Sequence, residues 1–123
     1  MGNYEGKYVD GFVLPVPTAN LDAYRKMAEL AGHVWRDHGA LEYVECIADD
    51  VKPGKVTSFP QSVDLKDGET VILAWVVYKS REHRDEVLAK VMQDDRMKNQ
   101  TPADMPFDGM RMFWGGFKVL LEV

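Results

Sequence analysis

The chain has 123 residues, 46% of them hydrophobic and 28% charged, with a formal net charge of −5. These values suit one folded domain over residues 1–123 and exclude a disordered chain. The acidic balance and the scattered lysines and arginines argue against binding to nucleic acids or anionic membranes. The single cysteine excludes an internal disulfide, and with no signal peptide or membrane-length apolar run we expect a cytoplasmic protein.

The pattern of apolar residues predicts four strands and two long helices in chain order. Prolines end the first strand, Asn20 or Thr18 caps the first helix, and Ser80 caps the second. A single helical turn, capped by Thr57 or Ser58, is expected within the irregular segment 49–69. The expected elements are a strand over 8–16, a helix over 20–38, strands over 41–48 and 70–79, a helix over 80–98 and a strand over 110–123.

The order strand, helix, strand, strand, helix, strand is typical of a ferredoxin-like α+β fold. The sheet of such a fold is antiparallel, and both helices pack on one of its faces. Gly115–Gly116 in the last strand indicates a bulge or a close approach of the backbone to a neighbour.

The strand over 70–79 is apolar on both faces, because Val71 to Tyr78 contain no polar residue. A strand with one face in water should alternate between apolar and polar residues. Two helices cover only one face of the sheet, so the other face would be an unusually large exposed apolar patch. The simplest cover is a second copy of the sheet, and we therefore expect a homodimer formed through this face.

Several blocks of the sequence resemble the YbaA-like bacterial proteins, catalogued as domain of unknown function 1428. The most specific blocks are "ETVILAWVVYKSREHRDEV" and "MPFDGMRMFWGGFKVLLEV", and the resemblance runs over almost the whole chain. It implies a ferredoxin-like dimeric α+β barrel. That superfamily includes cofactor-free monooxygenases, haem-degrading enzymes and ligand-binding regulators, whereas the family itself implies no activity.

Two carboxylates interrupt apolar rows in the predicted strands and are candidate general bases. Asp10 shares a strand face with Tyr8 and Phe12, and Glu45 shares one with Tyr43 and Ile47. A carboxylate buried beside aromatic rings has a raised pKa and can accept a proton. The alternative, which we favour, is that both carboxylates form structural ion pairs.

His38 is the third candidate for proton transfer, because it ends the buried stripe of the first helix. Its alternative role is a capping residue at the helix C-terminus. His33 and Asp37 are spaced for two metal ligands, but no third ligand is evident. We therefore expect no metal and no cofactor.

Aromatic and polar residues near the strand ends are candidates for ligand contacts. Trp75 and Trp114, with Tyr43, are expected to line one aromatic surface. Asp108 and Arg111, around the tight turn of "MPFDGMR", are candidates for the rim of a cavity or for a structural corner. The segment 49–69 is long enough to act as a lid.

Three functions remain open. The first is a small-molecule-binding dimer with an apolar pocket, and the second is a cofactor-independent oxygenase that acts on an apolar or aromatic substrate. The third is a structural dimer without a pocket. An enclosed cavity of ~300 Å³ or more would favour the first two.

Overall fold

The computed structural model describes residues 4–101 and 105–123. Its strands pair antiparallel in one four-stranded sheet of order β2-β3-β1-β4. The strands are β1 (Tyr8–Pro17), β2 (Glu42–Ile47), β3 (Glu69–Tyr78) and β4 (Phe113–Lys118). The helices are α1 (Leu21–Asp37), α2 (Phe59–Ser62), α3 (Arg81–Gln93) and α4 (Asp95–Lys98), with 3-10 turns at Thr18–Asn20 and Gly109–Arg111.

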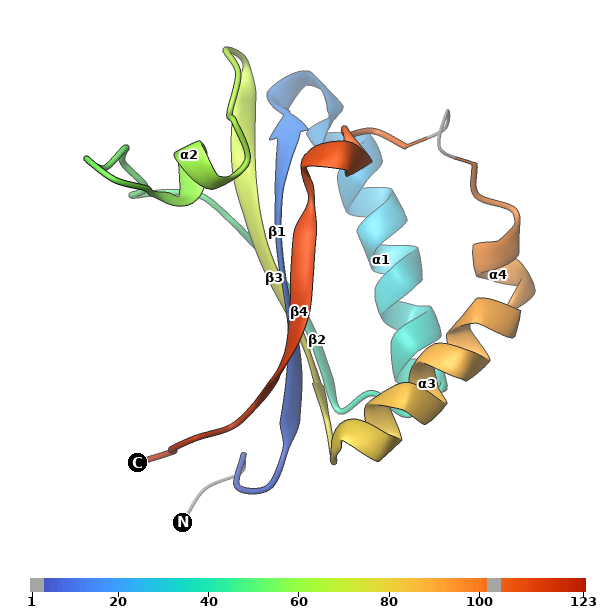
Figure 1. Cartoon of the computed structure of the whole chain (residues 1–123). Helices are drawn as coiled ribbons and strands as arrows, with labels where there is room; N and C mark the ends of the chain where they lie inside the picture. Colours follow the sequence, from blue (N-terminus) through green and yellow to red (C-terminus); the bar gives the residue numbers. More distant parts are fainter. Residues whose placement is uncertain (1–3, 102–104) are drawn as a thin grey trace.

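The layers follow the predicted ferredoxin-like arrangement. Helices α1, α3 and α4 cover one face of the sheet, here called the inner face, while α2 lies on the opposite, outer face (Figure 1). The sheet of a single chain is open, with β2 and β4 as its two edges. The predicted α+β class and the strand and helix order are therefore confirmed, and any barrel has to be completed by another chain.

Helix α1 begins after the prolines of β1 and carries its apolar residues on one side. Tyr24, Ala28, Ala31 and Val34 are buried at spacings of three and four residues, which is the pattern of an amphipathic helix packed on a sheet. The chain leaves the helix through Gly39 at a φ of 115°. Glycine adopts this left-handed backbone at no steric cost.

The second long helix is shorter than predicted. Ser80 caps α3, where its hydroxyl accepts a hydrogen bond from the backbone N–H of His83 at 3.1 Å. The expected continuation to Lys98 is wrong, because Asp94 is extended (φ −76°, ψ 127°) and ends α3. The Asp94 carboxylate instead caps α4 by accepting from the backbone N–H of Arg96. Aspartate favours such caps over helix interiors.

The segment 49–69 covers one end of the outer face. Val63 from this segment packs with Val13 and Val71, all three of them buried. Ser58 caps the predicted helical turn by accepting from the backbone N–H of Gln61. This segment does not form a lid over the inner face, because α2 lies on the opposite side of the sheet from α1 (Figure 1).

The close approach predicted at Gly116 is confirmed, while β4 pairs with β1 in register without a bulge. A Cβ on Gly116 would overlap the Tyr8 hydroxyl and the Arg84 guanidinium, and it would lie 2.6 Å from Tyr8 Cε2. A glycine therefore allows these two side chains to lie against β4.

Candidate functional site

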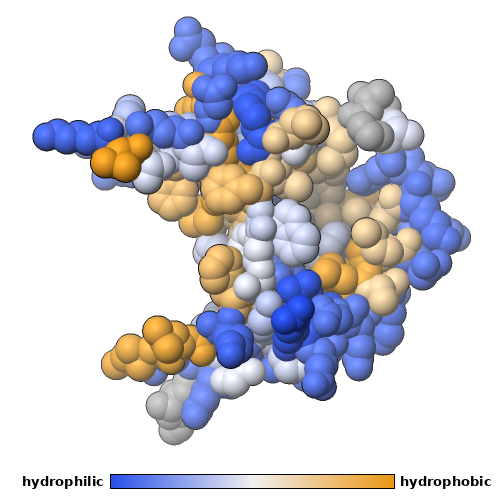
Figure 2. All heavy atoms as spheres, viewed as in Figure 1, coloured by the Kyte–Doolittle hydropathy of each residue, from blue (hydrophilic) through white to orange (hydrophobic). Residues whose placement is uncertain are grey.

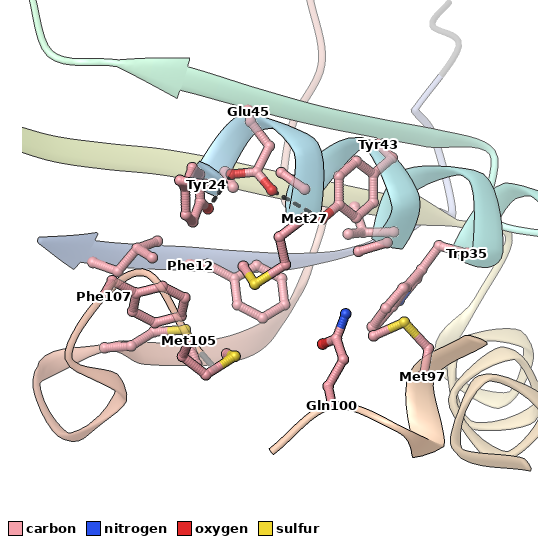
Figure 3. A pocket seen from close by; sticks show the side chains of 16 residues that line it. Phe12, Tyr24, Met27, Trp35, Tyr43, Glu45, Met97, Gln100, Met105 and Phe107 are labelled. Carbon is pink, nitrogen blue, oxygen red and sulfur yellow. Dashed lines mark hydrogen bonds between the residues drawn. The ribbon is translucent and has the colours of Figure 1, made fainter. Parts of the chain in front are cut away.

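An apolar cavity of about 160 Å³ lies between the inner face of the sheet and α1. Side chains from β1, β2, β3, α1, α4 and the segment before β4 line it (Figure 3). Aromatic rings and methionines form most of its wall: Phe12, Tyr24, Trp35, Tyr43 and Phe107, with Met27, Met97, Met105 and Met112. Methionine side chains adapt to irregular shapes, so this wall suits a small apolar body.

One carboxylate faces this space and is held by two phenols. Glu45 accepts a hydrogen bond from the Tyr24 hydroxyl at 2.5 Å and another from the Tyr43 hydroxyl at 2.9 Å. Burial, followed by the neighbouring Glu45, raises the pKa of both tyrosines. Both phenols therefore stay protonated and act as donors.

The strand register explains two of the three residues in this cluster. Tyr43 and Glu45 lie two residues apart on β2, opposite Val76 and Ala74 of β3, and so they share the inner face as the alternation predicts. Tyr24 comes from α1. Tyr24 lies on the buried side of that helix, but nothing in the sequence paired it with Glu45.

A second, open cleft lies between α1 and β2 and is lined by Tyr24, Tyr43 and Glu45 as well. The cluster therefore lies between the apolar cavity and a surface that solvent reaches. Gly32 on α1 makes room for one member, because a Cβ there would meet Tyr43 Cδ1 at 3.0 Å.

Asp10 lies on the inner face but does not line the cavity. It is fully buried, and its Oδ1 lies 3.5 Å from Nε of Arg84 on α3. Burial raises the pKa of Asp10, and the Arg84 guanidinium partly offsets that rise. The contact with Arg84 is the ion pair considered as the alternative to a catalytic role.

His38 also lies away from the cavity. It follows α1 as its C-cap, and its Nε2 lies 2.8 Å from Asp94 Oδ2. This contact joins the end of α1 to the junction of α3 and α4, which matches the capping role. Of the three candidate proton-transfer residues, only Glu45 lines the cavity.

The expectation of one aromatic surface shared by Trp75 and Trp114 is wrong. Trp114 pairs with Phe12 on the inner face and stacks on its ring, with the centroids 5.8 Å apart. Trp75 pairs with Val44 and Gly11 on the outer face. Trp75 lies opposite Gly11 and Trp114 lies opposite Phe12. Gly11 and Phe12 are neighbours on β1 and face opposite sides of the sheet, so the two tryptophan rings do as well.

Asp108 and Arg111 form a structural corner. The guanidinium of Arg111 donates to both Glu69 oxygens at 2.7 and 2.6 Å and to Asp108 at 3.0 Å. It also donates to the carbonyl oxygens of Val63 and Asp64. These bonds use the donors of Arg111 on the protein itself, and neither Asp108 nor Arg111 lines the cavity.

Among the residues that the structure describes, no group of three or more His, Cys, Asp and Glu side chains is arranged to hold a metal ion. Over the same residues, no helix combines the length and the hydropathy needed to cross a membrane.

Three comparisons place the chain among known proteins. The family described as "Protein of unknown function (DUF1428)" matches residues 7–109. The proteins called "Uncharacterized protein YbaA" from Escherichia coli K12 and from Shigella flexneri are each 47% identical over 116 residues, which cover 94% of this chain and 98% of theirs. A crystal structure of a dimeric ferredoxin-like protein from an uncultured marine organism superposes with a TM-score of 0.58 at 12% identity. The match covers 95% of this chain and 98% of that one, and it supports the fold.

Proposed function

The chain belongs to the DUF1428 family, and we propose that this member binds a small apolar molecule in the cavity between the sheet and α1. The observation that carries the proposal is the Tyr24–Glu45–Tyr43 cluster at the edge of a space otherwise walled by aromatic rings and methionines. An apolar pocket with a few fixed polar groups is the usual design of a small-molecule site.

The size of the cavity limits the ligand. At about 160 Å³ it does not reach the ~300 Å³ expected from the sequence analysis for a ligand-binding or oxygenase function, which is the size typical of drug-sized ligands. It is close to the ~150 Å³ of an engineered apolar cavity that binds benzene. The cavity therefore suits a molecule with one ring or a short branched chain.

Binding is favoured over proton transfer because of the surroundings of Glu45. Both of its oxygens already accept a hydrogen bond from a phenol, and the other two candidate bases lie outside the cavity. An oxygenase would need Glu45 to leave at least one phenol before it could accept a proton from the substrate.

The methionines allow a direct test by NMR with ¹³C-labelled methionine methyl groups. Met27, Met97, Met105 and Met112 line the cavity, while Met92 and Met110 are exposed. Titration with toluene, a neutral single-ring probe, should shift the four cavity methyl signals with one common saturation curve. Met92 and Met110 should not follow that curve.

Two alanines on α1 provide matched variants. Ala31 lines the cavity, whereas Ala23 is exposed. Ala31→Leu should fill part of the cavity and weaken toluene binding by at least about tenfold, while Ala23→Leu should leave it unchanged. Equal binding in the two folded variants, or no saturable shift in the unsubstituted protein, would contradict the proposal.

We also propose that a second copy of the chain covers the outer face. Leu73, Phe113 and Phe117 on this face are 38%, 47% and 65% exposed. In Figure 2 two parts of the chain extend outward on the side of the outer face, and both carry hydrophobic side chains. Comparison with Figure 1 identifies them as the segment around α2 and the C-terminal end. Leu120 and Leu121 at that end are 98% and 75% exposed. The marine ferredoxin-like protein of the same fold is described as dimeric.

Sedimentation velocity tests the dimer. Leu73→Asp places a charge in the middle of the outer face and should yield a monomer, because an unpaired charge inside an interface is costly. Met110→Asp places the same charge at a site that is 93% exposed and away from the strands, and should leave the dimer intact. A monomer in the unsubstituted protein at micromolar concentration would contradict the proposal.

A further inference from the structure

The charge inside the cavity points to the class of ligand. We infer that the bound molecule is a compact organic cation, an amine with one small apolar group, whose ammonium is held by Glu45. This inference rests on the proposed function and adds a charge to the ligand.

Glu45 has no cationic partner among the residues that the structure describes. Among residues 4–101 and 105–123, no Lys, Arg or His nitrogen lies within 4.0 Å of its carboxylate. Three other well-covered carboxylates do have such a partner: Asp10 has Arg84 at 3.5 Å, Glu69 has Arg111 at 2.6 Å, and Asp94 has His38 at 2.8 Å. A carboxylate that is partly removed from water is strongly stabilised by an opposite charge.

The cluster has acceptors left for an ammonium group. A carboxylate has about four lone-pair sites, and the two phenols occupy one on each oxygen of Glu45. The phenol oxygens can themselves accept a hydrogen bond. An ammonium has three N–H donors and no acceptor, so it complements this set without leaving a polar atom unpaired.

The walls also suit a cation with an apolar body. The rings of Trp35 and Tyr43 lie beside each other with centroids 6.0 Å apart, and Tyr24 meets Phe107 edge to face at 5.7 Å. Aromatic faces attract a nearby ammonium and exclude an anion. In Figure 3 the amide of Gln100 lies on the far side of the space from Glu45, where it is available to a second polar group of the ligand.

The open cleft between α1 and β2 provides the route to the carboxylate. Arg25, His33 and Arg36 also line this cleft, but none of their nitrogens lies within 4.0 Å of the Glu45 carboxylate. Arg36 instead donates to the carbonyl oxygen of Leu41. The ammonium can therefore approach Glu45 from the side where solvent already reaches it.

Three probes of similar size test the inference on the full-length protein: benzylamine, benzyl alcohol and benzoate. The readout is again the methyl signals of the cavity methionines at pH 7. Benzylamine should bind at least about tenfold more tightly than benzyl alcohol, as expected for a hydrogen bond to a charged group. Benzoate should not bind detectably.

Glu45→Gln should remove the preference for the amine, because it keeps the shape and the acceptor but loses the charge. Glu29→Gln makes the same change of charge at an exposed position of the cleft and should keep the preference. The methionine methyl spectrum of each variant without probe shows whether the variant is folded. The comparison of the three probes on the unsubstituted protein tests the inference even if a variant does not fold.

The outcomes separate the two proposals. Equal binding of benzylamine and benzyl alcohol would overturn the inference and leave the proposed function standing. Tighter binding of benzoate would also overturn it. If none of the three probes shifts the cavity methyl signals, the inference fails, and the proposed function fails with it only if toluene also gives no saturable shift.

Discussion

Replacement of Arg84 by methionine tests whether Asp10 has a structural rather than a catalytic role. The Arg84 side chain is 13% exposed, and its Nε lies 3.5 Å from Oδ1 of the fully buried Asp10. The guanidinium also lies over the ring of Tyr8, 5.1 Å from its centroid. Arg84→Met keeps most of the apolar stem and removes the charge, so Asp10 remains buried without a cation.

The expected cost is about 3 kcal/mol at neutral pH. Removal of one partner from a buried ion pair destabilises proteins by about 3–5 kcal/mol. The contact here is a single nitrogen–oxygen approach at 3.5 Å, without a hydrogen bond between the two groups, so the lower end of that range applies.

The cost should depend on pH in a defined direction. Burial raises the pKa of Asp10 and Arg84 lowers it, so loss of Arg84 raises the pKa further in the folded state. An unfolded aspartate titrates near pH ~3.9. As the pH falls from the folded pKa of the variant toward the lower folded pKa of the unsubstituted protein, only the variant has bound the proton, and the cost shrinks by about 1.4 kcal/mol per pH unit.

Urea unfolding of the variant and the unsubstituted protein at pH 8 and pH 5, at one protein concentration, measures this difference. Arg81→Met is the control, because Arg81 is exposed on the same helix, and it should change stability by less than about 0.5 kcal/mol. Asp10→Asn combined with Arg84→Met should recover most of the loss. A loss of equal size at both pH values, with no recovery in the double variant, would refute the electrostatic explanation and leave only lost packing.

Three further predictions concern single residues. Gly116→Ala should destabilise the protein by about 2 kcal/mol in urea unfolding, because the new Cβ overlaps Tyr8. In the control Gly115→Ala the new Cβ meets only the Phe117 ring at 3.7 Å, so stability should change by less than about 0.5 kcal/mol. Similar losses in both variants would contradict the overlap. Asp94→Asn should lower the melting temperature at pH 7, because bonds from Arg96 and then His38 hold the pKa of Asp94 below its usual range. That deficit should disappear as the pH falls through the depressed pKa, and a deficit that persists in acid would contradict the charge effect. Arg111→Lys should lower the melting temperature although the charge is kept, because lysine cannot bond both Glu69 oxygens and two carbonyls at once; an unchanged melting temperature would show that charge alone suffices.

The fold was predictable because its signals are local. Ser80 and the prolines around the end of β1 mark where elements begin and end, and the order of strands and helices then selects the topology. The eight apolar residues from Val71 to Tyr78 also predicted that both faces of β3 need cover. Part of that cover is the chain's own segment around Val63, which no periodic pattern could place.

The site was predictable only in part, because it depends on which face each strand presents. Alternation correctly grouped Tyr43 with Glu45, but it could not show that Trp75 and Trp114 lie on opposite faces until the register with β1 and β3 was known. The pairing of Glu45 with Tyr24 joins residues that are 21 positions apart. Such a contact depends on how α1 lies across the sheet, which side-chain packing determines.

The break at Asp94 has a different cause. The sequence of α3 and α4 has helical composition throughout, so propensity alone favours one continuous helix. The Asp94 carboxylate makes a tertiary contact with His38 and a local one with Arg96, and together these contacts favour an extended residue there.

Native mass spectrometry of the protein, expressed at a low level in bacteria and purified under mild conditions, tests most directly whether the cavity holds a ligand. We predict a dimer in which each protomer carries one small additional mass, released on collisional activation and absent from Ala31→Leu. The charge of the released molecule in positive-ion mode would then report whether it is an amine. A protein without added mass, whether monomer or dimer, or an added mass that Ala31→Leu retains, would contradict a ligand site beneath α1.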